Sequence, residues 1–201
     1  MPLLRFVMWF FGPLVRFIFR IKTVGAENIP KEGRVILACN HLSAWDPVYI
    51  GATQKRTFRT MAKAELFDNK IVAFFISRMG AFPVHRGASD IKSISTAMRI
   101  LKKDEDMLLI FPEGTRSKDR KLGELHTGVA AIAYKTKTPV VPVYISEKGK
   151  PKMFRKSLIT YGKPVPAEEL AGEEGSEHDK YARGTEKLRE AMLALRNEDY
   201  E

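Results

Sequence analysis

Residues 35–47 read VILACNHLSAWDP, an apolar run followed by a polar loop. The apolar run Val35–Cys39, with Gly33 before it and polar residues after it, predicts a buried strand. His41 follows the end of that strand, and Asp46 follows His41 by five residues. Loops at the ends of strands are where a rigid scaffold presents catalytic groups. The stretch therefore predicts a strand of the core and a candidate site at its end.

The pairing of His41 with Asp46 has two interpretations. A histidine can take a proton near neutral pH when a carboxylate on its other ring nitrogen fixes its tautomer and orientation. The four intervening residues allow the loop to turn back, so that Asp46 can reach His41. Alternatively, His41 is an ordinary loop residue and Asp46 only caps a helix that begins at Pro47, since proline is favoured at the first helical position. The pair alone does not choose between catalysis and capping.

Apolar and amphipathic segments alternate along the rest of the chain. Further strands are expected within residues 22–33 and at 57–61, 81–84, 107–111, 139–145 and 158–161. Helices are expected at 47–53, 69–78, 90–103, 128–137 and 179–195. This alternation predicts an α/β fold, a mostly parallel central sheet flanked by helices, with ligands beyond the carboxyl ends of the strands. Residues 22–201 are expected to form one domain, because no linker is long enough to divide them.

Two arginines, Arg86 and Arg116, follow apolar strands of this predicted sheet. Guanidinium groups bind phosphate oxygens in a bidentate fashion. The adjacent Gly87 and the nearby Gly114 would let the backbone approach a ligand closely. Two arginines at equivalent strand ends suggest a phosphate-bearing acceptor whose hydroxyl faces the histidine. The simpler alternative is that each arginine lies on a solvated surface.

Four motifs together resemble the signatures of the glycerolipid acyltransferases, which acylate glycerol phosphate and lysophosphatidate. In chain order they are NHLSAWD at 40–46, GAFPVHRG at 80–87, FPEGTRS at 111–117 and VVPVYI at 140–145. The resemblance spans roughly residues 24–146, and the spacings between the motifs match throughout. One such motif would be weak, whereas four in the family's order are specific.

The resemblance implies a reaction. A fatty acyl group would pass from an acyl thioester, on acyl carrier protein or coenzyme A, to the 2-hydroxyl of 1-acyl-glycerol 3-phosphate. The product would be phosphatidic acid, for phospholipid biosynthesis. His41 would take the hydroxyl proton and Asp46 would orient the imidazole. Substrate-binding residues would be Asn40, Arg86, Gly87, Glu113, Gly114, Thr115 and Arg116.

Several roles within these motifs stay open. Asn40 either fixes the loop or contacts the developing oxyanion, and Glu113 either bonds a glycerol hydroxyl or holds Arg116. His126 stands where many family members have a lysine, which leaves one cationic contact to phosphate in doubt. Cys39 lies inside an apolar strand, so we interpret it as a small buried hydrophobe and not as a nucleophile. No metal or bound cofactor is implied.

The first 21 residues are predicted to form an amphipathic membrane anchor. Only ten residues separate Arg5 from Arg16, whereas a spanning helix needs about 20 apolar residues. At about 100° per residue, these arginines and Arg20 fall within about 60° of one another. Opposite them lie Leu3, Phe10, Leu14, Phe17 and Ile21.

This pattern is typical of a helix lying in the bilayer interface. Pro13 is expected to kink this helix or split it in two. The expected location is the cytoplasmic face of the cell membrane, as a peripheral or monotopic protein. The alternative is a terminal helix packed on its own domain.

The formal net charge of +10 is unevenly distributed. From Val165 onward, eleven acidic residues face five basic ones, a net charge of −6, so the first 164 residues carry +16. Such a body attracts anionic lipid, phosphorylated substrates or nucleic acid. A single cysteine excludes an internal disulfide and fits a reducing cytosol. Four scattered histidines make a metal site unexpected.

Two alternative functions remain at the level of sequence. The nearer one is the same chemistry on glycerol 3-phosphate or another lysophospholipid. The more distant one is a non-catalytic basic protein that binds membrane surfaces or nucleic acid. The His41–Asp46 pair beside two strand-end arginines disfavours the second, because electrostatic binding needs no such pair. We therefore expect the chain to bind a membrane surface rich in anionic lipid, and not nucleic acid.

Overall fold

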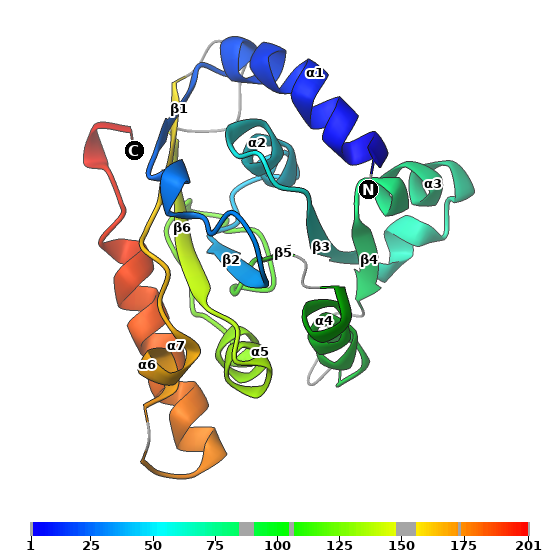
Figure 1. The fold of residues 1–201 in the computed structure, drawn as a ribbon. Helices are drawn as coiled ribbons and strands as arrows, with labels where there is room; N and C mark the ends of the chain where they lie inside the picture. Colours follow the sequence, from blue (N-terminus) through cyan, green and yellow to red (C-terminus); the bar gives the residue numbers. More distant parts are fainter. Residues whose placement is uncertain (1, 85–90, 105–106, 148–155, 173, 201) are drawn as a thin grey trace.

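A seven-stranded sheet runs through the computed structural model, which describes residues 2–84, 91–104, 107–147, 156–172 and 174–200. The strand order is β1-β7-β6-β2-β5-β3-β4 (Figure 1). The strands are β1 (Ile21–Val24), β2 (Val35–Cys39), β3 (Phe58–Lys63), β4 (Ala81–Val84), β5 (Met107–Ile110), β6 (Val140–Glu147) and β7 (Ser157–Tyr161).

Strand directions confirm a mostly parallel sheet. β2 pairs in parallel with β5 on one side and with β6 on the other, and β3 pairs in parallel with β5 and β4. Every residue of β2 is buried, because it lies in the middle of the sheet with both faces covered. The carboxyl ends of β2, β5 and β6 therefore meet at one edge of the sheet.

Two strands at the other end of the sheet run in the opposite direction. β7 is antiparallel to β6, and β1 is parallel to β7. As a result, β1 begins at the edge where β2 and β6 end. The loop that follows β2 and the start of β1 therefore lie at the same edge of the sheet.

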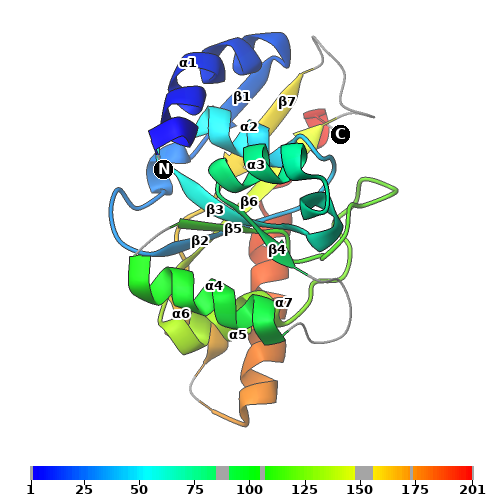
Figure 2. The same ribbon diagram turned by 90° about the vertical axis from the view of Figure 1, so that its right-hand side faces the viewer.

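Helices cover both faces of the sheet. They are α1 (Pro2–Ile18), α2 (Asp46–Thr53), α3 (Lys70–Arg78), α4 (Ile91–Asp104), α5 (Gly128–Thr136), α6 (Ala167–Ala171) and α7 (Glu177–Leu193). α1 and α2 lie on one face and α4 to α7 on the other (Figures 1 and 2). Alternate residues of β2 point to these two layers: Leu37 packs with Tyr49 of α2, and Ile36 packs with Leu101 of α4.

Of the two outcomes expected for Pro13, a kinked helix or a split one, the split is wrong. α1 is one helix, although a proline within a helix removes one backbone hydrogen bond. Close packing of α1 on α2 holds it: a Cβ added at Gly12 would lie only 3.6 Å from Cα of Ala52. No helix in the described part of the chain is both long and apolar enough to cross a bilayer.

The end of the first helix also differs from expectation. Ile21, expected on the apolar face of that helix, instead begins β1 and is buried in the core. Arg20 lies beyond the helix in a left-handed conformation, with a φ of 44°. The chain therefore leaves the helix three residues earlier than the apolar pattern suggests, because the strand takes up the last apolar residue of that pattern.

The acidic tail contains one helix more than the sequence pattern indicates. α6 is five residues long, too short to show a helical period, although Pro166 precedes it and two glutamates occupy its first turn. α7 begins at Glu177, because the side chains of Ser176 and Asp179 form a capping box. The expected helix at 179–195 is thus shifted by two residues.

Candidate active site

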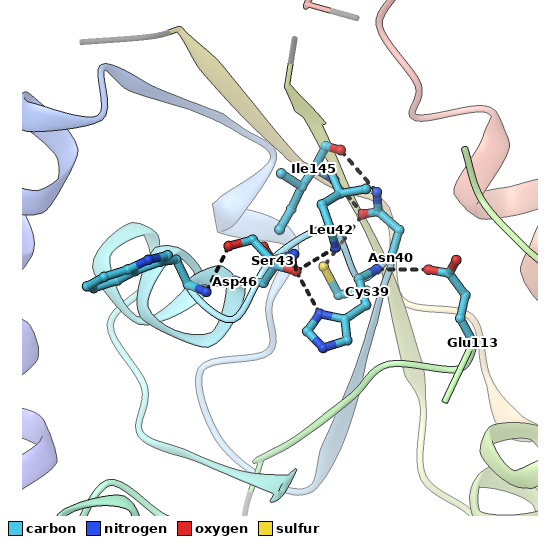
Figure 3. Close-up of polar contacts among 9 residues, drawn as sticks. Cys39, Asn40, Leu42, Ser43, Asp46, Glu113 and Ile145 are labelled. Atoms are coloured by element: carbon cyan, nitrogen blue, oxygen red, sulfur yellow. Dashed lines mark hydrogen bonds and ion pairs between the residues drawn. The ribbon is translucent and has the colours of Figure 1, made fainter. Parts of the chain in front are cut away.

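The loop after β2 brings His41 and Asp46 into direct contact. Nδ1 of His41 lies 2.7 Å from Oδ2 of Asp46. The same carboxylate oxygen accepts hydrogen bonds from the backbone N–H groups of Leu42, at 2.7 Å, and Ser43, at 2.8 Å (Figure 3). Asp46 is fully buried at the start of α2, so three donors converge on a carboxylate that water does not reach. α2 thus begins at Asp46, one residue before the start expected at Pro47.

The contact with Asp46 fixes the tautomer of His41. An ionised carboxylate only accepts hydrogen bonds, so Nδ1 of a neutral imidazole must carry the proton. Nε2 is then the proton acceptor. The ring also stacks on Phe111, with centroids 4.0 Å apart and planes inclined by 18°. With 13% of the side chain exposed, the imidazole is held on two sides and still reaches solvent.

Glu113 ties the loop after β2 to the long connection between β5 and α5 through its carboxylate. Oε1 accepts from the backbone N–H of His41 at 2.8 Å, and Oε2 accepts from the backbone N–H of Gly123 at 2.9 Å. The residue is only 5% exposed. Burial raises the pKa of this carboxyl above its ordinary value, although the two N–H groups act in the opposite direction. These backbone partners differ from both roles considered from the sequence, a glycerol hydroxyl and Arg116.

Asn40 lies inside the sheet and not on a ligand surface. Its Nδ2 donates to the carbonyl of Ile145 at 3.0 Å, and its Oδ1 accepts from the N–H of Ile145 at 2.7 Å. The side chain is almost fully buried. Of its two possible roles, fixing the loop matches this geometry, whereas a contact to substrate does not. Figure 3 shows Asp46 and Glu113 approaching the loop from opposite sides, with Asn40 holding it to β6.

The turn after β5 presents the other predicted acceptor residues. Gly114, Thr115 and Arg116 are all exposed there. Gly114 has a φ of 65°, and a Cβ at this position would lie 3.0 Å from Cδ2 of His126. The imidazole of His126 thus lies against the turn that carries Arg116. A side chain at position 114 would both strain the backbone and displace this ring.

The second arginine of the prediction, Arg86, lies outside the described residues, as do Gly87 and His85. β4, which leads to them, ends at Val84 and runs parallel to β3.

Two parts of the site were not singled out from the sequence. Phe111 carries the stacking face for His41, and its place directly after an apolar strand was the available signal. Gly123 supplies a backbone N–H to Glu113, and a Cβ there would lie 3.1 Å from Oε2 of that carboxylate. No sequence pattern marks this second role.

Cys39 lies beside this arrangement but does not supply a nucleophile to it. Cys39 is fully buried, and burial together with the nearby Asp46 and Glu113 carboxylates raises the pKa of its thiol. A thiol of this kind stays protonated and is a poor nucleophile. Within the described residues, no group of three or more histidine, cysteine, aspartate or glutamate side chains is placed to hold a metal ion.

A family model described as "Acyltransferase" matches residues 20–146, which contain the whole site. The chain belongs to this acyltransferase family. The 1-acyl-sn-glycerol-3-phosphate acyltransferase of Bacillus subtilis is 31% identical over 181 residues, which cover 88% of each chain. The enzyme of that name from Streptococcus pneumoniae is 37% identical over 119 residues, 58% of this chain and 44% of the longer relative.

A solved structure of the acyltransferase family has the same fold. The crystal structure of the 1-acyl-sn-glycerophosphate acyltransferase PlsC from Thermotoga maritima superposes with a TM-score of 0.65. The superposition covers 96% of this chain and 95% of that one, at 24% sequence identity. The family resemblance and the α/β fold with a mostly parallel sheet, both expected from the sequence, are thereby confirmed.

Proposed function

We propose that this acyltransferase moves a fatty acyl group from an acyl thioester to the 2-hydroxyl of 1-acyl-glycerol 3-phosphate, forming phosphatidic acid. The observation that carries the proposal is the 2.7 Å contact between Nδ1 of His41 and buried Asp46, which leaves Nε2 as a base. The names of the relatives from B. subtilis and S. pneumoniae, both 1-acyl-sn-glycerol-3-phosphate acyltransferases, support the choice of acceptor.

The reaction needs no covalent enzyme intermediate. The acceptor hydroxyl oxygen attacks the thioester carbonyl while Nε2 of His41 takes the hydroxyl proton. Asp46 stabilises the imidazolium that forms, because its buried carboxylate carries the opposite charge. When the tetrahedral intermediate collapses, the carbon–sulfur bond breaks and the imidazolium returns the proton to the departing thiolate. The products are phosphatidic acid and the free thiol of acyl carrier protein or coenzyme A.

The phosphate of the acceptor binds beyond the carboxyl end of β5. Arg116 is exposed in the turn that follows Glu113, and Gly114 lets the backbone of that turn approach a ligand. The carboxylate of Glu113 accepts a hydrogen bond from the backbone N–H of His41, so the position of this turn is fixed relative to the base. The +16 charge of the first 164 residues attracts the same anionic acceptor.

The acyltransferase works at a membrane surface, as a peripheral or monotopic protein of the cytoplasmic face. Support comes from α1, whose outer face exposes large apolar side chains, including Trp9 at 75% and Phe17 at 73%. The acceptor and the product are amphiphiles that partition into a bilayer. An interfacial helix brings the enzyme to them. The inner side of α1 packs on α2, so the helix serves both its own domain and the membrane.

An acyl-transfer assay on a panel of acceptors tests the proposed reaction. We expect 1-acyl-glycerol 3-phosphate to be acylated much faster than glycerol 3-phosphate, and an unphosphorylated monoacylglycerol to be acylated slowest. Equal rates with phosphorylated and unphosphorylated acceptors would show that no phosphate site exists. Supplying the donor first on acyl carrier protein and then on coenzyme A identifies the thioester.

Replacing Arg116 by alanine should weaken binding of the phosphorylated acceptor. Loss of one charge-assisted contact costs about 1.5–3 kcal/mol, roughly a tenfold to hundredfold rise in acceptor KM. The KM for the acyl donor should change much less. Arg99→Ala on the far side of the molecule is the matched control for loss of charge, since Arg99 is exposed on α4. A rise in donor KM alone would mean that the two substrates bind the other way round.

Polar substitutions on the outer face of α1 should weaken membrane binding. For Trp9→Ser combined with Phe17→Ser, partitioning to vesicles of anionic phospholipid should fall about tenfold, because less apolar surface enters the interface. Acyl transfer to detergent-dispersed acceptor should be retained. Val24→Ser removes an exposed apolar side chain elsewhere and serves as control. Sedimentation of the double variant equal to that of the parent chain would place the membrane contact outside α1.

A further inference from the structure

The third helix, α3, is well formed but packs only loosely on the domain. No residue between Lys70 and Arg78 is fully buried, although the helix contains five large apolar side chains. Its packing partners are β4 and the 3₁₀ turn Ala64–Phe67. The side chain of Asn69 caps it by accepting from the N–H groups of Ile71 and Val72, at 3.0 and 3.2 Å. Its hydrophobic contact with the domain is therefore limited to one narrow side of the helix.

The exposed side of α3 is apolar, which reverses the usual arrangement of a surface helix. Ala73 and Ile76 are the half-buried residues. Outward-facing side chains include Ile71, 71% exposed, and Phe75, 58% exposed, with Val72 and Phe74 beside them. Leu66, in the preceding 3₁₀ turn, and Met79, just after the helix, extend the apolar surface. An exposed apolar surface of this extent marks a contact with a partner or a membrane.

Positive charge borders the helical part of this apolar surface, whereas two carboxylates, Glu65 and Asp68, lie in the segment before it. Lys70 and Arg78 occupy the two ends of α3, and the helix has no acidic residue. The guanidinium carbon of Arg78 lies 4.3 Å above the ring of Phe74, so the aliphatic stem follows the apolar face while the charge stays at its border. Apolar side chains flanked by cations match a bilayer, where hydrocarbon lies beneath anionic headgroups.

The position of α3 relates it to the first helix. α3 connects β3 to β4 at one end of the sheet, on the same side of the molecule as α1 (Figure 1). The N-terminal end of α1 lies close to α3 in both ribbon views (Figures 1 and 2). The two helices, each of which exposes large apolar side chains, are thus neighbours on one side of the molecule.

We infer that α3 is a second membrane contact, whose outward face (Leu66, Ile71, Val72, Phe74, Phe75 and Met79) enters the interface of an anionic phospholipid bilayer. The inference rests on the proposed function at a membrane and adds an orientation to it. A domain held by one interfacial helix can still rotate about the axis of that helix. A second contact beside the first prevents this rotation. Contact through both α1 and α3 therefore sets how the His41 loop is turned relative to the lipid surface.

Site-specific labelling tests this contact directly. The only cysteine, Cys39, is fully buried, so an Ile71→Cys full-length variant accepts an environment-sensitive fluorophore at α3 alone. Phe17→Cys on α1 is the reference for membrane contact. Glu186→Cys, at an exposed position of α7, is the negative control. Vesicles of phosphatidylcholine and phosphatidylglycerol should produce a blue shift and higher intensity at positions 71 and 17, but not at 186.

A binding measurement on unlabelled protein complements the fluorescence. Ile71→Ser combined with Phe75→Ser should lower the partition coefficient for the same vesicles about tenfold, with activity on detergent-dispersed acceptor retained. Val24→Ser is again the control for loss of an exposed apolar side chain.

The outcomes separate this inference from the proposed function. A blue shift at position 17 without one at position 71 overturns the α3 contact and leaves membrane binding through α1 intact. A blue shift at position 71 that is already present without vesicles, together with a larger particle mass in light scattering, would identify a second copy as the occupant and overturn the lipid assignment. Absence of acyl transfer in detergent would refute the proposed reaction, whatever the labels report.

Discussion

Acyl transfer by a His41→Ala variant is expected to be about 10²–10⁴-fold slower than by the parent chain, the range for loss of a general base. The loss should appear in kcat, because the imidazole acts on the proton that moves during the reaction and holds no substrate phosphate. Single-turnover measurements with saturating acceptor isolate this step. Circular dichroism and thermal melting establish that the variant is folded.

Asp46→Asn completes the test of the base. The amide keeps the size of the carboxylate but lacks the charge that stabilises the imidazolium, so we expect a loss of similar order. Asp68→Asn, an exposed carboxylate outside the site, controls for the change of charge. Near-normal turnover in folded His41→Ala protein would exclude His41 as the base.

Glu113→Gln is expected to be nearly as damaging as Glu113→Ala, although glutamine has the same shape. Each carboxylate oxygen faces a backbone N–H donor, one from His41 and one from Gly123. A glutamine amide has one oxygen and one NH₂ group, so either orientation turns a donor toward a donor. Loss of a hydrogen bond to a charged group costs about 1.5–3 kcal/mol, and the unpaired buried donor adds to it.

The effect of Glu113→Gln should appear in both stability and kcat. The midpoint of thermal unfolding should fall, and kcat should fall because the backbone of His41 is released. Glu124→Gln, an exposed glutamate of the following segment, is the matched control. If instead Glu113→Gln only raises acceptor KM with stability unchanged, the carboxylate acts on the substrate and not on the loop.

The centre of the fold could be predicted because its signals are local. An uninterrupted apolar run such as Val35–Cys39 occurs in strands buried on both faces, and the structure places it in the middle of the sheet. The spacing of His41, Asp46 and Pro47 allowed either a contact between the two side chains or a simple helix cap, and the structure shows the contact.

Features that depend on distant backbone positions could not be predicted. The carboxylate of Glu113 bonds a backbone N–H 72 residues away, and no side-chain pattern records where backbone amides point. The reversed direction of β1 and β7 depends on strand order, which apolar runs alone do not specify. Ile21 was misassigned for a related reason: an apolar residue at the end of an amphipathic helix looks the same whether it enters a membrane or a core.

The paired hydrogen bonds between Asn40 and Ile145 have a consequence for how the enzyme fails. The side-chain amide of Asn40 takes the place of a backbone amide against β6, which in effect adds one rung to the ladder between β2 and β6. The N–H of Ile145 can exchange with solvent only when that rung opens. The residue immediately before His41 therefore belongs to the cooperative unit of the central sheet. On heating, we expect catalytic competence and the sheet to be lost in one transition, without an earlier stage in which an intact domain carries a loosened site.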